Sequence, residues 1–270
     1  MPRSRPRSKV PPVSKNTSWE NVAEWYGALL EGEGTYQKEL ILPNLLRLMD
    51  IRRGDAVLDL ACGPGFFSRE FAARGAVVTG VDASNALIAI AKKGATEKGA
   101  RAANVTFHAA PADAMPFIKD ASVDKVAIVL ALQNMENVAA VLHECARVLK
   151  KGGTVYGVLN HPAFRVPKAS AWGWDEKEKV QYRRVDRYLS ELKVPIAMHP
   201  GERSGHVTMS FHRPLQYYFK ALNKAGFAVS LMEEWNSNKR SQEGPRANAE
   251  DLARKEIPLF MCLVAIKRPA

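Results

Sequence analysis

The chain has 270 residues, of which 46% are hydrophobic and 25% charged, so it can bury a full core in one large domain or two small ones. No apolar run approaches the roughly 20 residues that span a bilayer, and the first fifteen residues contain no apolar segment of the kind found in secretory signals. The three cysteines form no CxxC pair. These features predict a globular cytoplasmic protein with neither a disulfide framework nor a zinc site.

The formal net charge of +11 is unevenly distributed along the chain. Five basic residues lie in the proline-rich residues 1–15, which contain no acidic residue, and the remaining charge of +6 belongs to the rest of the chain. Such a composition cannot bury a core, so we expect residues 1–15 to be a disordered, solubilising tail. An RNA-binding arm is the alternative, because lysine and arginine clusters supply phosphate affinity.

Two helices are the first elements that the sequence predicts, at residues 19–30 and 36–49. The second has apolar side chains at the i, i+3, i+4, i+7 spacing of a buried helix face. These side chains are Leu42, Leu45, Leu46 and Met49.

From residue 56 onward, short apolar segments alternate with helical ones. The predicted strands are 56–61, 77–81, 105–108, 125–130 and 154–159, and the predicted helices begin at 66, span 85–98 and start again at 138. We expect Lys150 to Gly153 to stop this last helix, with cations at the negative end of its dipole. The alternation predicts an α/β fold, a doubly wound, mostly parallel Rossmann-like sheet with helices on both faces. Ligands of such sheets bind at the carboxyl ends of the strands.

The alternation lapses after residue 160. Residues 161–206 are rich in aromatic and arginine residues and are predicted to be a cap inserted over the strand ends. A helix from Leu215 to Gly226 and strands at 228–234 and 259–266 follow, and a second insertion, 236–257, is predicted to form a solvated helix. Residues 16–270 are therefore expected to form one domain, with its core at 50–160 and 207–270.

The turn after the first predicted strand has two glycines. Gly63 and Gly65 allow backbone amides to approach a ligand at the start of a helix. Asp82 ends the second strand, where a carboxylate can accept both hydroxyls of a ribose. A dinucleotide fingerprint would have a third glycine where this chain has Ser68, which argues against a nicotinamide-dependent oxidoreductase.

The segment "AAPADAMPF" places Asp113 just past the third strand, where it can accept a hydrogen bond from an adenine amino group while the next backbone amide meets a ring nitrogen. The series "DLACGPG", "GVDAS", "PADAMPF", "SVDKVAIVLALQNMEN" and "ARVLKKGGTVYGVLN" resembles the class I S-adenosylmethionine-dependent methyltransferases, most closely over residues 35–160. "HRPLQYYFKALNKAGF" and the last two strands complete that family's seven-stranded pattern.

The resemblance implies a role for each matching residue. Asp59, Gly63 and Gly65 would hold the methionine part of S-adenosylmethionine, Asp82 with Ala83 the ribose, and Asp113 with Ala114 the adenine. Residues from Leu130 to Gln133 would lie beneath the sulfonium. Apart from the resemblance, Tyr26 and Tyr36 of the N-terminal helices are candidates to close over the cofactor, and core packing would explain them equally. Asp59 as a packed structural carboxylate is the main alternative, and no residue pattern indicates a metal. The product of transfer would be S-adenosylhomocysteine.

The acceptor is less defined than the cofactor. The chain lacks the Asn/Asp-Pro-Pro-aromatic motif of many base and glutamine methyltransferases, and no cysteine follows a proline as in cytosine C5 enzymes. The aromatic cap favours a small-molecule acceptor. His161 and His212 are candidate general bases, although structural hydrogen bonding would equally explain them. The candidate acceptor-side residues are Tyr36, Arg165, Trp172, Tyr182 and Arg213.

Two other interpretations remain open. The basic tail and the cap arginines would also suit an RNA or protein methyltransferase. A regulatory or scaffold protein that binds the cofactor without catalysis is compatible with the same motifs, because fold and cofactor do not establish an acceptor. The sequence gives no indication of the oligomeric state.

Overall fold

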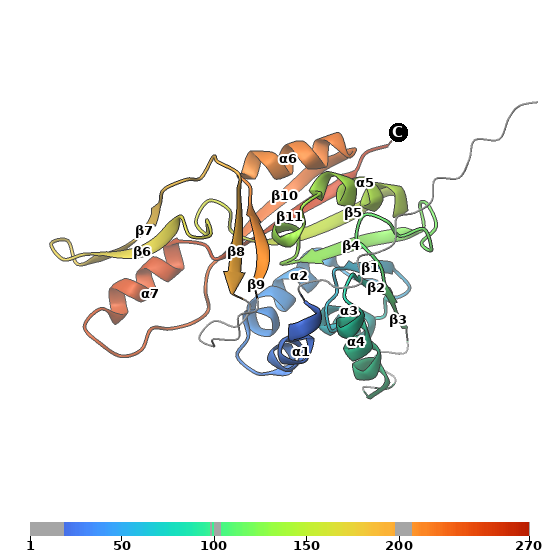
Figure 1. Ribbon diagram of the computed structural model, residues 1–270, viewed down its shortest axis with the longest axis horizontal. Helices are drawn as coiled ribbons and strands as arrows, with labels where there is room; N and C mark the ends of the chain where they lie inside the picture. Colours follow the sequence, from blue (N-terminus) through green and yellow to red (C-terminus); the bar gives the residue numbers. More distant parts are fainter. Residues whose placement is uncertain (1–18, 98, 100–103, 198–206, 270) are drawn as a thin grey trace, which may run out of the picture.

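A seven-stranded sheet forms the centre of the computed structural model, which describes residues 19–97, 99, 104–197 and 207–269 (Figure 1). The basic tail predicted at residues 1–15 lies outside the described residues. The strand order is β10-β11-β5-β4-β1-β2-β3. The strands are β1 (Ala56–Leu60), β2 (Val77–Asp82), β3 (Val105–Ala109), β4 (Val123–Val129), β5 (Leu149–Asn160), β10 (Phe227–Trp235) and β11 (Phe260–Lys267).

The first five strands are parallel, whereas β11 runs antiparallel to both β5 and β10. This arrangement confirms the predicted α/β class and the mostly parallel seven-stranded sheet. Within the described residues, no helix is both long and apolar enough to cross a membrane.

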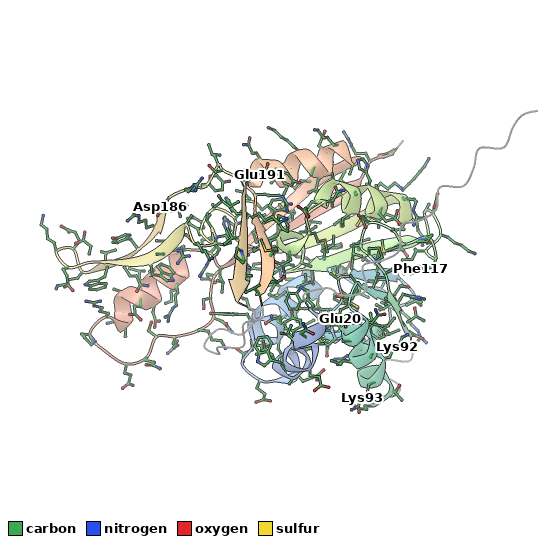
Figure 2. All side chains as sticks on the ribbon, in the orientation of Figure 1. Glu20, Lys92, Lys93, Phe117, Asp186 and Glu191 are labelled. Atoms are coloured by element: carbon green, nitrogen blue, oxygen red, sulfur yellow. The ribbon has the colours of Figure 1, made fainter. Side chains whose placement is uncertain are left out.

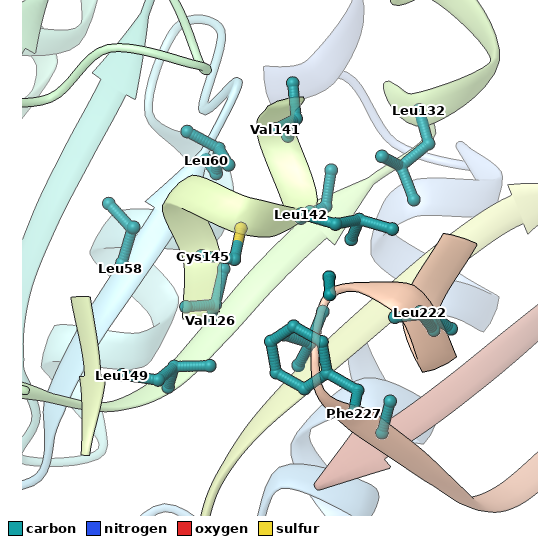
Figure 3. Close-up of a cluster of buried hydrophobic side chains, with 14 of the residues drawn as sticks. Leu58, Leu60, Val126, Leu132, Val141, Leu142, Cys145, Leu149, Leu222 and Phe227 are labelled. Atoms are coloured by element: carbon teal, nitrogen blue, oxygen red, sulfur yellow. The ribbon is translucent and has the colours of Figure 1, made fainter. Parts of the chain in front are cut away.

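Helices cover both faces of the sheet (Figure 1). On one face lie α5 (Val138–Val148) and α6 (Leu215–Lys224), which share a buried apolar cluster with the sheet (Figure 3). On the other face lie α2 (Leu42–Met49), α3 (Phe66–Ala73) and α4 (Asn85–Glu97). The chain before α2 adds α1 (Ala23–Glu31), the short 3-10 helix η1 (Glu20–Val22) and the π-helical turn η2 (Gln37–Ile41). The apolar spacing predicted for 36–49 is thus confirmed, with Leu45 and Met49 fully buried.

The predicted helix stop at Lys150–Gly153 is wrong. Helix α5 ends at Val148, and Leu149 already belongs to β5, where it is fully buried opposite Val123. The pairing register between β4 and β5 then shifts, because residues 150–153 form an irregularity in β5. Burial of Leu149 in the sheet therefore decides where the helix ends, rather than the glycines.

The cap has more regular structure than its sequence indicates. Two antiparallel hairpins form it, β6 (Ser170–Asp175) with β7 (Val180–Val185) and β8 (Leu192–Ala197) with β9 (Val207–His212). In Figure 2, the labelled Asp186 and Glu191 lie along the segment that joins the hairpins. Because β9 pairs with β8 and not with the main sheet, the boundary expected at residue 207 falls inside a hairpin.

The second insertion lies against this cap. Helix α7 (Ala247–Glu256) packs beside β7, as Figure 1 shows, and Ala253 is buried. Arg246 just before α7 lies over the ring of Trp174 at 4.5 Å and pairs with Glu176 at 2.7 Å. The predicted helix is confirmed, but one of its faces contacts the hairpin instead of solvent.

Candidate active site

A hollow lined by residues of many elements lies where the strand order reverses, at the carboxyl ends of β1 and β4. Its cavity volume is about 440 Å³, in the range of small-molecule sites. Open parallel sheets bind ligands at this position, because the loops that leave neighbouring strands diverge there. The lining residues are Trp19, Tyr26, Ala61, Gly63, Val81, Asp82, Ala83, Leu87, Ala110, Pro111, Ala112, Asp113, Val129, Leu130, Ala131, Asn134, Met135, Glu136, Asn137, Val141 and Thr208.

The two glycines of the first turn have different surroundings. Gly63 lines the cavity with φ +55°. Gly65, with φ +77°, precedes α3 and does not line it. A Cβ at Gly65 would lie 2.7 Å from the Phe107 ring. Gly63 therefore faces the cavity, whereas Gly65 is required by backbone conformation and packing.

Asp82 is held at the wall of the cavity by two backbone amides. The Gly63 amide donates to its Oδ2 and the Ser84 amide to its Oδ1, each at 2.9 Å. Burial raises the pKa of Asp82 above its ordinary value, while these two donors oppose the shift. Each carboxylate oxygen keeps a further lone pair, so the group can accept from two ligand hydroxyls.

Asp59 lies elsewhere. Its side chain does not line the cavity, is 1% exposed and accepts a 2.5 Å hydrogen bond from the Ser68 hydroxyl on α3. Burial raises the pKa of Asp59 to about 7. This placement differs from the contact with the methionine part that the resemblance implies, and it matches the alternative of a packed structural carboxylate.

Where the resemblance would place the adenine, the exposed Asp113 lines the cavity beside the apolar segment Ala110–Ala112. The amide of Ala114 does not fit its expected role, because it donates to the Pro111 carbonyl at 3.2 Å within the turn. The turn thus presents the Asp113 carboxylate but uses the next amide to close itself.

The two central strands end in unusual backbone conformations. Ala61 after β1 has φ +59° and Leu130 after β4 has φ +53°, and both line the cavity. Non-glycine residues with such positive φ are uncommon and concentrate at functional sites. Gln133, expected beneath the sulfonium, does not line this cavity, because its Nε2 donates at 2.8 Å to the Leu130 carbonyl.

The roof of the cavity comes from segments far apart in sequence. Trp19 and Tyr26 pack with their ring centroids 5.1 Å apart, and Thr208 of β9 adds a polar side chain. Glu20 accepts hydrogen bonds from the amides of Asn85 and Ala86, which ties η1 to the start of α4 (Figure 2). Burial, and secondarily the charge of Asp82, raises the pKa of Tyr26 to about 12.

Sequence reasoning missed Trp19 and Thr208. Neither belongs to a motif, and Thr208 reaches the cavity only because β9 folds back over the strand ends. No periodicity could have indicated it.

Neither candidate base lines the cavity. His161 is 1% exposed, its Nδ1 accepts from the Ala163 amide, and its Nε2 lies 2.6 Å from Glu234 Oε1. The proton is therefore assigned to Nε2. The Nε2–H of His212 donates to the Tyr188 carbonyl at 2.7 Å. Burial lowers the pKa of both imidazoles. Both imidazoles are engaged in hydrogen bonds within the protein.

The five candidate acceptor-side residues also lie outside the cavity lining. Tyr36 shares a 2.8 Å hydrogen bond with Ser237, and Tyr182 is 46% exposed over Gly173. Arg213 donates to the carbonyls of Met135 and Glu136 at 3.0 and 2.7 Å, which anchors the cap to the loop after β4. The guanidinium groups of Arg165 and Arg183 lie 5.9 and 5.2 Å from the Trp172 ring.

Metal-ligating side chains do not gather in the part of the chain that the structure describes. There, no group of three His, Cys, Asp or Glu residues is placed to hold a metal ion.

The family model and the relatives that match this chain are all described as methyltransferases. Residues 58–157 match the family model of the methyltransferase domain. Demethylmenaquinone methyltransferase of Tropheryma whipplei (strain Twist) is 35% identical over 117 residues, which are 43% of this chain and 46% of that protein. A ubiquinone/menaquinone biosynthesis C-methyltransferase of Acidiphilium cryptum is 33% identical over 157 residues, 58% of this chain and 60% of that protein. The chain thus spans about half the length of these curated relatives.

The fold agrees with this match. An S-adenosylmethionine-dependent methyltransferase from Mesorhizobium loti has a TM-score of 0.67 and 24% identity, over 86% of this chain and 100% of that one. At this identity the likeness shows the fold alone. Residues 58–157 belong to the methyltransferase domain family, and the chain has the fold of the class I S-adenosylmethionine-dependent methyltransferases.

Proposed function

We propose that this protein transfers a methyl group from S-adenosylmethionine to a small organic acceptor. One observation supports it most directly: the Asp82 carboxylate stands at the cavity wall with its two oxygens fixed by the amides of Gly63 and Ser84. This is the acceptor geometry that a ribose diol requires. Residues 16–270 would work as one domain, with the cap part of the site.

The remaining walls suit the other parts of the cofactor. Leu87, Val141 and the Ala110–Ala112 segment offer apolar contact to a flat ring, and Asp113 offers an acceptor at its edge. Gly63 lines the cavity at the first turn, on the side where the amino-acid portion would lie.

When bound, S-adenosylmethionine supplies an electrophilic methyl group on a sulfonium, which leaves as a neutral thioether. The chain's contribution is to hold an acceptor in line and to exclude water. Leu130 and Ala131 line the inner wall, and Trp19, Tyr26 and Thr208 restrict access from solvent. No histidine faces the cavity within the described residues, so a base is not part of this proposal.

A small acceptor is favoured by the cap and by the relatives. Strand β9 lies against η4 (Leu132–Asn134) and contributes Thr208 to the lining, so the cap covers part of the cavity. Both relatives named above are methyltransferases of quinone biosynthesis by name. For this chain, the acceptor remains a proposal.

Calorimetric titration tests the cofactor. We expect S-adenosylmethionine and S-adenosylhomocysteine to bind and NADH not to bind. Release of S-adenosylhomocysteine in the presence of small acceptors then tests the reaction. A protein that binds the cofactor but methylates no small acceptor would instead support the scaffold interpretation. Loss of turnover and of salt dependence on removal of residues 1–15 would support an RNA substrate.

A further inference from the structure

A second, smaller hollow lies under the cap next to the cavity. Its volume is about 30 Å³, enough for about two water molecules or one carboxylate group. None of its lining side chains is acidic, and three of them are arginine or histidine. The lining residues are Gln133, Asn160, Pro162, Arg165, Pro167, Ser210, Phe211, His212, Arg213 and Tyr218.

We propose that the methyl acceptor carries a carboxylate group and that Arg165 binds this group in the small hollow. The inference rests on the proposed function, whose substrate class it defines.

Arg165 is the cation of the hollow that lacks a counter-charge. Its Nε is buried without a hydrogen-bond acceptor, and the contact of its guanidinium within the described residues is with the Trp172 ring, at 5.9 Å from the centroid. Burial and the nearby charge of Arg183 lower the pKa of Arg165. Arg165 is partly buried, and a partly desolvated cation without a counter-charge is unfavourable. A bound anion would remove this cost.

The other cationic lining groups are already engaged. Arg213 donates to two main-chain carbonyls and lies 3.9 Å from Glu191, and His212 donates to Tyr188. Arg183, behind Arg165, donates to the Phe164 carbonyl and the Ser170 hydroxyl. An anion entering the hollow would therefore meet Arg165 as its available charged donor within the described residues.

Adjacent residues connect the two spaces. Asn134 lines the cavity and its neighbour Gln133 lines the hollow, while Thr208 and Ser210 do the same from the buried face of β9. Two residues along a strand span roughly 7 Å. The cavity and the hollow thus lie next to each other along β9, so one small molecule can place a carboxylate at Arg165 and its methyl-accepting atom in the cavity.

The polar atoms along this path match such a molecule. Gln133 Oε1 and Asn134 Oδ1 are buried without a donor. Their orientation follows from the amide nitrogens, which both point to the Leu130 carbonyl. Each oxygen can accept from a hydroxyl or amine of the acceptor, so the substrate class is a small hydroxy- or amino-carboxylate.

The test uses 4-hydroxybenzoate and its neutral isostere 4-hydroxybenzamide as probes of the full chain loaded with S-adenosylhomocysteine. We expect the carboxylate to bind at least about tenfold more tightly than the amide, as a charge-assisted hydrogen bond provides. Arg165→Met should reduce this ratio to within about twofold, and Arg165→Lys should retain part of it. Arg184→Met is the matched control, because Arg184 is an exposed arginine of the same cap, on β7, and pairs with Asp186.

Two results overturn the inference: no saturable binding of 4-hydroxybenzoate to the loaded protein, or a ratio in Arg165→Met equal to that of the unchanged protein. Binding of S-adenosylhomocysteine is measured for every variant. If the unchanged protein does not bind S-adenosylhomocysteine, the proposed function is refuted. If it binds S-adenosylhomocysteine but does not prefer the carboxylate to the amide, only the role of Arg165 is refuted. Backbone amide NMR spectra of Arg165→Met test whether this variant is folded.

Discussion

The Gly63 amide donates a 2.9 Å hydrogen bond to Oδ2 of Asp82, although the two residues are 19 positions apart. The bond joins the turn after β1 to the end of β2, the neighbouring strand. The same carboxylate that fixes the turn therefore also faces the cavity, and a change at Asp82 affects both.

Replacing Asp82 with asparagine should weaken binding of S-adenosylhomocysteine by about tenfold to a hundredfold. The physical reason is the loss of charge-assisted hydrogen bonds, each worth roughly 1.5–3 kcal/mol. Asp113→Asn is the comparison, since Asp113 is exposed and water can replace part of its contact, so its effect should be severalfold at most. Calorimetry measures both. Unchanged affinity in Asp82→Asn would contradict the ribose role.

Substitution of Gly65 with alanine should destabilise the fold by about 3 kcal/mol. A Cβ there would lie 2.7 Å from Phe107 Cζ and would occupy a backbone with φ +77°, so overpacking adds to conformational strain. Gly226→Ala separates the two effects, because Gly226 has φ +90° and no atom lies within 4 Å of the place that a Cβ would take. We expect about 1 kcal/mol for that control. Urea unfolding gives both values, and equal losses would exclude the clash.

The raised pKa of Asp59 predicts a pH dependence of stability. Burial raises this pKa to about 7 from its ordinary value of 3.8, so between these values the folded state binds more protons than the unfolded state. Stability from this group is therefore present at low pH and is lost as the pH rises toward 7, with a limiting slope of about 1.4 kcal/mol per pH unit.

Asp59→Asn provides the reference, because it keeps the shape and stays neutral. The free energy of unfolding of the unchanged protein, minus that of this variant, should fall between pH 5 and pH 7. A difference that is constant with pH, or that rises, would show that Asp59 is ionised throughout.

His161→Gln should lower stability by about 2 kcal/mol and leave methyl transfer within about threefold at a temperature where the variant is folded. It removes the Nε2 contact with Glu234 and the acceptor for the Ala163 amide, both remote from the cavity lining. Glu234→Gln, which keeps an acceptor for Nε2–H, should cost less. A hundredfold loss of turnover in folded His161→Gln would restore His161 as a general base.

Much of the sheet and half of the site follow from local sequence. Short apolar strands alternating with helices predict the parallel sheet, because strand and helix periods depend on neighbouring residues. Gly63 and Asp82 are predictable for the same reason: both lie directly at strand ends, and parallel strands bring their carboxyl ends to one edge.

Contacts between segments that are distant in sequence determine where the other side chains lie in the structure. Asp59 alternates onto the face covered by α3 and meets Ser68, and His161 meets Glu234, 73 residues later. Thr208 reaches the cavity only because β9 packs against η4. Local periodicity specifies which element forms and which face is apolar. Which polar group lines a site depends on the packing of whole elements, and that is a property of the tertiary structure.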